Sequence, residues 1–481
     1  MNKKISIYGI LQGANVLVFL AMIYVFSIFG ENQYINSSTI WINGLICVLS
    51  LFVIRDGARN QNALIAVLAY IMVIHYELRI VSLNWTEFSS IFQERVDVTA
   101  HQINWILVYV AISYLLSWLG LHFIKRDNNK VVNQAGELFK RKATRNVLIL
   151  LYVSFFVIFL AAVGVPGIKQ IVGILSVYFL NLAFMLLFGI GYFFYRWKDI
   201  THKEKVLFIA FLIIYVAVFT GIGRRATIYG IAISFFFSML AFNKVNVKLK
   251  YIIGAFALLP FMIWLYSYST FTRQNQQQTL SIGEAVEMSS ALSEQMDGTN
   301  SRIILAPIFD RIAFLDFTVE MIHNADYLRN YLTPSNYAKS VVDNILTPGF
   351  DLFDMPKMSN VIKKCYVIKG PPSVKKYHLD DAEDYHSDGV SWFGEAYLLF
   401  GKVLALPVIL FVALIIRRYY LKLNKNKKLT NYWKLSIVLY MYYTLLYSYG
   451  IDWWLIYLVS FVINFIIFKA VAIRSIKIKK V

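Results

Sequence analysis

An arginine pair in this sequence has the surroundings that bind a phosphate group. Arg224 and Arg225 follow the tight turn 221–223 and precede an apolar segment, so they stand where a helix is predicted to begin. The free N–H groups of a helix start attract anions, and a guanidinium adds two parallel hydrogen bonds to a phosphate. The competing interpretation is that the pair anchors a membrane span among lipid headgroups.

Arg311 is a second candidate for phosphate binding. It follows Asp310 on the segment 307–328, whose apolar residues recur with the helical period, and it would point toward the membrane face. Two interpretations carry equal weight: Arg311 binds an anion, or it forms a structural ion pair with a neighbouring acid. Arg302 lies in the same long polar loop, residues 269–392, and is a weaker candidate of this kind.

His386 and Glu395 could act on a hydroxyl group. A histidine serves as a general base or a hydrogen-bond partner near neutral pH. Glu395 lies where the chain enters an apolar segment, a place in which a carboxylate is costly unless it has a purpose. Taken as an isolated pair, however, the two are better explained as a loop histidine and an interfacial cap at a helix N-terminus.

Ionisable residues also occur inside predicted membrane spans. His75 and Arg79 share one face of a helix that Glu77 does not share. Such residues favour a functional role, but a satisfied network between helices explains them equally well. Asp452 is another acid, with aromatic neighbours that suit a membrane interface.

The sequence contains no motif that is typical of metal or nucleotide binding. There is no P-loop, no GxSxG and no paired metal-ligand cluster, so neither a metal nor a cofactor is expected. The acids at 380–384 are better explained as a solvated run than as a cation site. Cys47 and Cys365 lie in a predicted span and a loop and form no disulfide framework.

The positions of these candidate residues follow from the prediction that most of the chain forms membrane helices. Hydrophobic residues make up 58% of the sequence, and the mean hydropathy is +0.57, too high for a soluble protein. The composition predicts an all-α polytopic membrane protein with about twelve transmembrane helices. The predicted spans are 6–29, 38–54, 62–84, 103–124, 147–164, 170–195, 206–222, 225–242, 250–268, 396–416, 433–449 and 452–472.

Charge fixes the predicted orientation of these spans. The connections at 55–59, 125–145, 196–205, 244–250 and 417–428 are basic, as are both termini, so these parts are expected in the cytoplasm. The same rule explains the net charge of +19 without a nucleic-acid partner. The Arg224–Arg225 turn then falls on the outer side, where the rule disfavours arginine, and this favours anion binding over headgroup anchoring. The first apolar stretch is expected to be a retained span rather than a signal peptide.

Three parts follow from this topology: an N-terminal membrane domain at 1–268, a partly helical extracytoplasmic loop at 269–392, and a C-terminal membrane segment at 393–481. Within the loop, helices are predicted at 283–296 and 307–328, and a third ends at 345–349. The apolar face of the second helix holds Ile308, Ile312, Leu315, Val319 and Ile322.

Three short stretches frame the loop. They are Gly223-Arg224-Arg225-Ala226 before a span, Ile345-Leu346-Thr347-Pro348 to Met355-Pro356 inside the loop, and His386-Ser387 leading into Gly394-Glu395-Ala396-Tyr397-Leu398-Leu399-Phe400-Gly401. In these stretches and in its overall topology, the chain resembles the O-antigen polymerase (Wzy) family, which joins oligosaccharide repeat units into bacterial surface polysaccharides. The related O-antigen ligases share the loop, the arginines and the histidine. At the last external turn the chain has Tyr449-Gly450 where some relatives have an arginine, so a third phosphate contact is either missing or shifted to Arg302.

The resemblance implies a metal-independent glycosyltransferase of the GT-C type in the bacterial cytoplasmic (inner) membrane. Its donor and acceptor would be oligosaccharides on undecaprenyl pyrophosphate, surrounded by membrane lipids, with a chain-length regulator as a further partner. By that resemblance, Arg224, Arg225 and Arg311 hold the donor pyrophosphate, His386 lies near the acceptor hydroxyl, and Glu395 supports it. A ligase that transfers the finished glycan and a flippase for lipid-linked oligosaccharides are the alternatives.

Overall fold

The protein is an all-α, multi-pass membrane protein in the computed structural model. The structure describes residues 4–83, 98–122, 137–139, 143–163, 169–221, 226–242, 246–249, 252–254, 257, 314–330, 332–346, 352–353, 355, 358, 390–424, 429–448 and 450–475. Within them, seven helices are long and apolar enough to cross a membrane: Ile7–Phe29, Ser37–Asn60, Ala63–Ser82, Ala100–His122, Ala143–Val163, Trp392–Asn424 and Trp453–Ala472.

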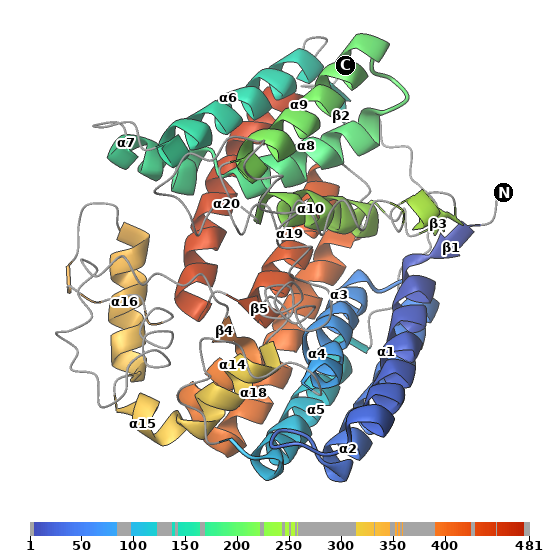
Figure 1. The fold of residues 1–481 in the computed structure, drawn as a ribbon. Coiled ribbons are helices and arrows are strands. Elements are labelled where there is room, and N and C mark those ends of the chain that lie inside the picture. Colours follow the sequence, from blue (N-terminus) through green and yellow to red (C-terminus); the bar gives the residue numbers. More distant parts are fainter. Residues whose placement is uncertain are drawn as a thin grey trace, which may run out of the picture.

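The helices pack side by side in one bundle, which Figure 1 shows from the side. The N-terminal half of the chain contributes α1 (Ile7–Phe29), α2 (Ser37–Asn60), α3 (Ala63–Met72), α4 (Leu78–Ser82), α5 (Ala100–His122), α6 (Ala143–Val163), α7 (Lys169–Ile174), α8 (Leu182–Arg196), α9 (His202–Gly221) and α10 (Ala226–Ala241). The C-terminal part contributes α18 (Trp392–Asn424), α19 (Leu429–Leu446) and α20 (Gly450–Ala472).

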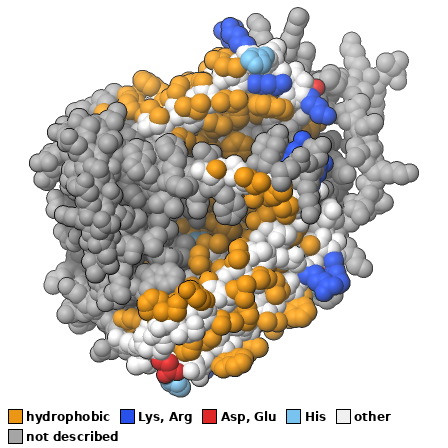
Figure 2. Space-filling model, turned by 45° about the vertical axis from the view of Figure 1, so that its right-hand side comes forward, with side chains coloured by type: hydrophobic (Ala, Val, Ile, Leu, Met, Phe, Trp, Pro, Cys, Tyr) orange, Lys and Arg blue, Asp and Glu red, His pale blue; other side chains and the backbone are white. Residues whose placement is uncertain are grey.

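Apolar side chains cover much of the described surface, as expected for helices that face lipid (Figure 2). Trp41, Leu45 and Val403 are among the most exposed of them. The predicted span 250–268 lies almost entirely outside the described residues.

Three short antiparallel strand pairs join segments that are distant in sequence. Strand β1 (Lys4–Ser6) pairs with β3 (Asn246–Lys248), and β2 (Glu137–Phe139) pairs with β6 (Ile473–Ser475). The third pair joins β4 (Val390–Ser391) to β5 (Tyr447–Ser448). The first two pairs therefore bring each chain end beside a connection that the sequence analysis also places in the cytoplasm.

The prediction of one unbroken span at 170–195 is wrong. After α7 the chain forms a π-helical turn, Leu175–Phe179, and then breaks before α8. Asn464 of α20 holds the break, because its amide donates to the carbonyl oxygen of Tyr178 (3.0 Å) and accepts from the N–H of Asn181 (3.1 Å). Asn181 in turn caps α8 by accepting from the N–H of Ala183. Without such partners, the exposed backbone groups of a broken span would be costly in a membrane.

Two boundaries also differ from the prediction. Residues 55–59, predicted as a connection, are the last turns of α2, where the Asp56 carboxylate binds Trp118 Nε1 (3.0 Å) and His122 Nδ1 (2.9 Å) of α5. The predicted span 396–416 begins earlier, at Trp392, and is interrupted at Gly401, whose φ of 74° is not helical.

Gly120 lets α5 and α18 approach closely. A Cβ atom built on Gly120 would lie 2.6 Å from the Cβ of Ala413 and 3.3 Å from the carbonyl oxygen of Leu410. We expect Gly120→Ala to destabilise the protein by about 1–3 kcal/mol, because a well-packed contact cannot take an added methyl group. Thermal unfolding of the detergent-purified protein measures this effect.

Gly13→Ala is the matched control for this variant. Gly13 also lies inside a helix, α1, but no atom of another described residue is within 4 Å of the position that a Cβ would occupy there. Alanine at this position should leave stability unchanged or raise it by up to about 1 kcal/mol, because glycine is a poor helix former. Equal unfolding temperatures for the two variants would show that the α5–α18 contact is loose.

Candidate functional site

The long polar segment, residues 269–392, packs into the helix bundle through helix α14 (Phe314–His323). It packs against α18 and α5, and every residue from Phe314 to Ile322 is buried. The prediction of an apolar face with Leu315, Val319 and Ile322 is confirmed, since all three are buried. The opposite face is buried too, with Asp316, Thr318 and Glu320 among protein atoms, so the helix has no solvent-facing side from Phe314 to Ile322. Ile308 and Ile312 lie outside the described residues.

A buried ion pair fixes α14 to the third span. Arg79 donates from Nε to Oδ1 of Asp316 (2.9 Å) and from Nη2 to Oδ2 (2.6 Å). Arg79 Nη1 also donates to Ser82 Oγ (3.0 Å), and both charged side chains are almost inaccessible to solvent. This forked geometry is the strongest form of an arginine–carboxylate contact. Because its guanidinium is engaged in this way, Arg79 acts as a positioning residue.

Tyr76 adds a second connection between the same elements. Its hydroxyl lies 2.7 Å from Ser391 Oγ of β4 and 3.1 Å from Thr318 Oγ1 of α14. Thr318 Oγ1 also donates to the carbonyl oxygen of Phe314. A single tyrosine of the third span thus contacts two separate parts of the polar segment, α14 and β4.

Glu395 is buried and binds across two helices. Its Oε1 accepts from the hydroxyl of Tyr337 (3.0 Å) in α16 (Pro334–Leu346) and from the N–H of Ile451 (3.1 Å) at the start of α20. The structure agrees with the cap interpretation in that Glu395 accepts from a helix start, but that helix is α20, and the Glu395 side chain is buried in the protein. A carboxylate at a helix start is stabilised by the free N–H groups there.

We expect Glu395→Leu to lower the free energy of unfolding by about 1–3 kcal/mol, because it removes the carboxylate that accepts two buried hydrogen bonds, from the Tyr337 hydroxyl and from the N–H of Ile451. Glu395→Gln keeps an amide oxygen in the same place and should cost less. The melting temperatures of the two purified variants decide this. If both variants have the melting temperature of the wild type, the two hydrogen bonds make no contribution to stability.

The break at Gly401 exposes carbonyl groups that Arg329 satisfies. Arg329 follows α14 in the short helix α15 (Ala325–Arg329) and donates to the carbonyl oxygens of Leu398 (3.0 Å) and Tyr397 (2.9 Å). These carbonyl groups belong to the last turn before the break, where helical acceptors lose their usual partners. The short helix 392–400 is therefore a separate unit, tied to the polar segment and distinct from the span that follows.

Glu77 points away from this centre, as the helical spacing predicted. It lies in a π-helical turn, Val73–Glu77, and its carboxylate accepts from Asn15 Nδ2 of α1 (2.7 Å) and from Ser50 Oγ of α2. Cys47 Sγ lies 3.5 Å away. Among the described residues no cation pairs with Glu77. Such π-helical turns recur at functional sites.

His75 faces the polar segment, on the same side as Arg79. Its ring lies 5.0 Å from that of Phe314 and 4.6 Å from that of Tyr447, with Tyr70 at 5.9 Å. The side chain is fully buried, and neither ring nitrogen has a hydrogen-bond partner within the described part of the chain. His75 therefore keeps its donor and acceptor capacity inside an aromatic box.

Five predicted site residues lie outside the described residues: Arg224, Arg225, Arg302, Arg311 and His386. Asp452 lies in the first turns of α20, and its side chain is not described. Of the predicted residues whose side chains are described, the structure brings Arg79 and His75 against α14, while Glu77 faces α1 and α2 and Glu395 faces α16 and α20.

Asp316 and Asp343 are polar residues that the sequence analysis missed. Asp343 of α16 accepts from the N–H groups of Leu352 (3.0 Å), Phe353 (3.1 Å) and Met355 (3.0 Å), so it orders the turn that follows. Asp316 stands in the run Phe314-Leu315-Asp316-Phe317, where apolar neighbours on all sides were a sign of burial. No metal-ligand cluster of three or more His, Cys, Asp or Glu occurs in the described residues.

Comparison with known proteins adds no relative: no protein-family model, no curated protein and no solved structure matches this chain.

Proposed function

We propose that the protein is a glycosyltransferase that polymerises undecaprenyl-pyrophosphate-linked oligosaccharide repeat units into a surface polysaccharide, such as O-antigen or capsule. The reaction takes place at the outer face of the bacterial cytoplasmic membrane. A growing glycan leaves its lipid pyrophosphate and is joined to the next lipid-linked repeat unit. Neither a metal nor a cofactor takes part, and a chain-length regulator is a further partner.

One observation carries this proposal: the polar segment is locked into the apolar bundle by buried polar contacts. Arg79 pairs with Asp316, Tyr76 reaches Ser391 and Thr318, and Glu395 binds Tyr337. An enzyme whose two substrates are anchored in lipid needs a fixed polar surface beside the membrane. Ordering groups before the reaction is what makes electrostatic catalysis effective.

The proposed site combines this frame with residues that the resemblance supplies. Arg225, with Arg224 and Arg311, holds the donor pyrophosphate and stabilises the charge that forms as the glycosidic bond breaks. Arg302 provides a further phosphate contact. His386 serves the acceptor hydroxyl, and Glu395 positions the chain around it. Along the sequence, the nearest described residues are Phe314 for Arg311 and Val390 for His386, and the elements they begin, α14 and β4, pack together.

The strand pairs support the proposed topology of about twelve spans with both termini in the cytoplasm. Strands β1 and β3, like β2 and β6, belong to segments that the positive-inside rule assigns to that side. Strands β4 and β5 join two segments assigned to the opposite side. The proposed GT-C-like architecture follows from this topology together with the family resemblance.

A flippase for lipid-linked oligosaccharides is the second candidate, and Glu77 favours it. A carboxylate inside a span, with no cation beside it among the described residues, is typical of transport proteins that move protons or ions. A ligase uses the same arginines as a polymerase but makes a different product. Elongation of a lipid-linked glycan by the purified protein in detergent excludes a flippase, because no membrane is crossed.

The surface glycan of a deletion strain tests the proposal directly. We expect single repeat units on their normal anchor, because polymerisation is lost while export and attachment persist. Long polymer accumulating on the lipid carrier, with none attached, would identify a ligase instead. Lipid-linked single units trapped inside the cell would identify a flippase.

A further inference from the structure

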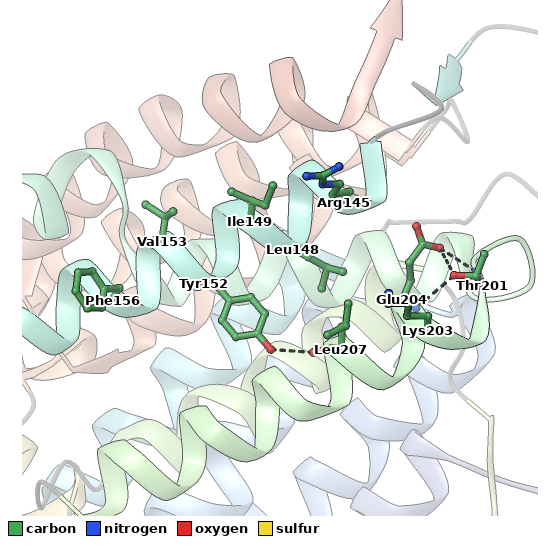
Figure 3. A pocket seen from close by; sticks show the side chains of 10 residues that line it. All are labelled: Arg145, Leu148, Ile149, Tyr152, Val153, Phe156, Thr201, Lys203, Glu204 and Leu207. Atoms are coloured by element: carbon green, nitrogen blue, oxygen red, sulfur yellow. Dashed lines mark hydrogen bonds between the residues drawn. The ribbon is translucent and has the colours of Figure 1, made fainter.

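A groove runs between α6 and α9 on the side of the bundle away from α14. Its volume is about 850 Å³, within the range of about 300–1,000 Å³ typical of ligand sites. Figure 3 shows its lining, which comes from one face of α6 and the first half of α9. The residues are Arg145, Leu148, Ile149, Tyr152, Val153, Phe156, Thr201, Lys203, Glu204 and Leu207.

The apolar part of the groove is open and has a fixed floor. Ile149, Val153 and Phe156 are exposed, as are side chains that face lipid elsewhere in this protein. Tyr152 forms part of the floor, where its hydroxyl donates to the carbonyl oxygen of Leu207 across the two helices (3.2 Å). Its ring packs edge-on against Phe211 at 5.2 Å. The floor is therefore built by contacts that do not depend on an occupant.

Charge is confined to one end of the groove. Arg145 lies in the first turn of α6 and Lys203 in the first turn of α9, and both are exposed. Glu204 is turned toward its own helix start, because its carboxylate accepts from the N–H (2.9 Å) and the hydroxyl (3.0 Å) of Thr201. Within the described part of the chain, neither Arg145 nor Lys203 forms an ion pair, so both are available for an anionic group at this end.

The length of the groove matches one leaflet of a bilayer. Arg145 and Phe156 are eleven helical steps apart, which is ~16 Å at a rise of ~1.5 Å per residue. The hydrocarbon core of a bilayer is ~30 Å thick, so an acyl chain of one leaflet covers about the same distance. A lipid with its headgroup at Arg145 would end its chain near Phe156.

We propose that this groove is a binding site for an anionic phospholipid of the cytoplasmic leaflet. Its phosphate-bearing headgroup lies between Arg145 and Lys203, and one acyl chain lies along Val153 and Phe156. Basic residues beside cytoplasmic span ends attract anionic headgroups. The site is remote from α14 and does not depend on the proposed glycosyltransferase activity.

The test titrates the purified full chain in detergent with phosphatidylglycerol and with phosphatidylcholine of identical acyl chains, and native mass spectrometry counts the bound lipid. We expect the wild type to bind phosphatidylglycerol at least about fivefold more tightly. Arg145→Glu with Lys203→Glu should abolish this preference. The control is Lys422→Glu with Lys469→Glu, which makes the same charge change at exposed residues of α18 and α20 and should keep the preference.

Val153→Trp supplies an independent variant, because it fills the groove and leaves both cations in place. It should weaken the binding of both lipids and keep their ratio. The proposal is overturned if the wild type shows no headgroup preference, if the preference survives the groove charge reversal, or if the control reversal removes it equally. Binding by Val153→Trp equal to that of the wild type would also overturn it.

Discussion

Replacing Asp316 by alanine is expected to lower the free energy of unfolding by about 3–5 kcal/mol, the usual cost of removing one member of a buried ion pair. The carboxylate takes two of the three hydrogen bonds that the Arg79 guanidinium makes to described side chains. After its removal, Arg79 stays in an interior that water does not reach. Equilibrium unfolding of the purified protein, followed by tryptophan fluorescence, measures the loss.

Two further variants decide whether the ion pair is the cause. Asp326→Ala removes the partner of another arginine, Arg329, but Asp326 is fully exposed, so its loss should cost at most about 1 kcal/mol. The double change Arg79→Met with Asp316→Leu should recover most of the stability, because it removes both charges together. A double variant as unstable as Asp316→Ala would mean that α14 is held by its packing and not by the pair.

Arg225→Ala is expected to reduce polymerisation at least about 10²-fold, the usual effect of removing one group that stabilises charge in a transition state. In the deletion strain, this variant should give single attached repeat units in place of the glycan ladder made by the wild-type chain. Gel analysis of the surface glycan reads the result, and immunoblotting of the membrane fraction confirms that the variant is present.

Arg59→Ala is the matched control for this loss. Arg59 is an exposed arginine in the last turn of α2, at the end of the bundle that the proposed topology places in the cytoplasm. Its removal changes the net charge equally and should leave the ladder intact. If Arg225→Ala gives an unchanged glycan ladder, Arg225 is not part of the proposed site, whatever the protein's function.

The sequence allowed the helices to be predicted well, because a membrane span is a local property of about twenty apolar residues. The interruptions could not be predicted in the same way. The break before α8 depends on Asn464, and the one at Gly401 depends on Arg329. In both cases the stabilising group comes from another helix, so no window of sequence around the break contains the cause.

In the candidate site, too, local features could be predicted from the sequence and long-range contacts could not. The spacing of His75, Glu77 and Arg79 correctly assigned their directions, since helical periodicity fixes which side chains share a face. The sequence could not identify Asp316 as the partner of Arg79, because the two residues are more than two hundred positions apart along the chain. Burial of α14 on all sides was not predicted, although a helix that is apolar except for single acids was the available sign of it.

The joint at Gly401 divides α18 into two parts with different neighbours. Residues 392–400 are bound to α15 through Arg329, to α16 and α20 through Glu395, and to α14 at Gly394. Glycine at the joint allows the non-helical φ of 74° that separates these residues from the span that follows. The first turns of this membrane helix therefore take their position from the polar segment and from α20, and the rest of α18 starts anew after the joint.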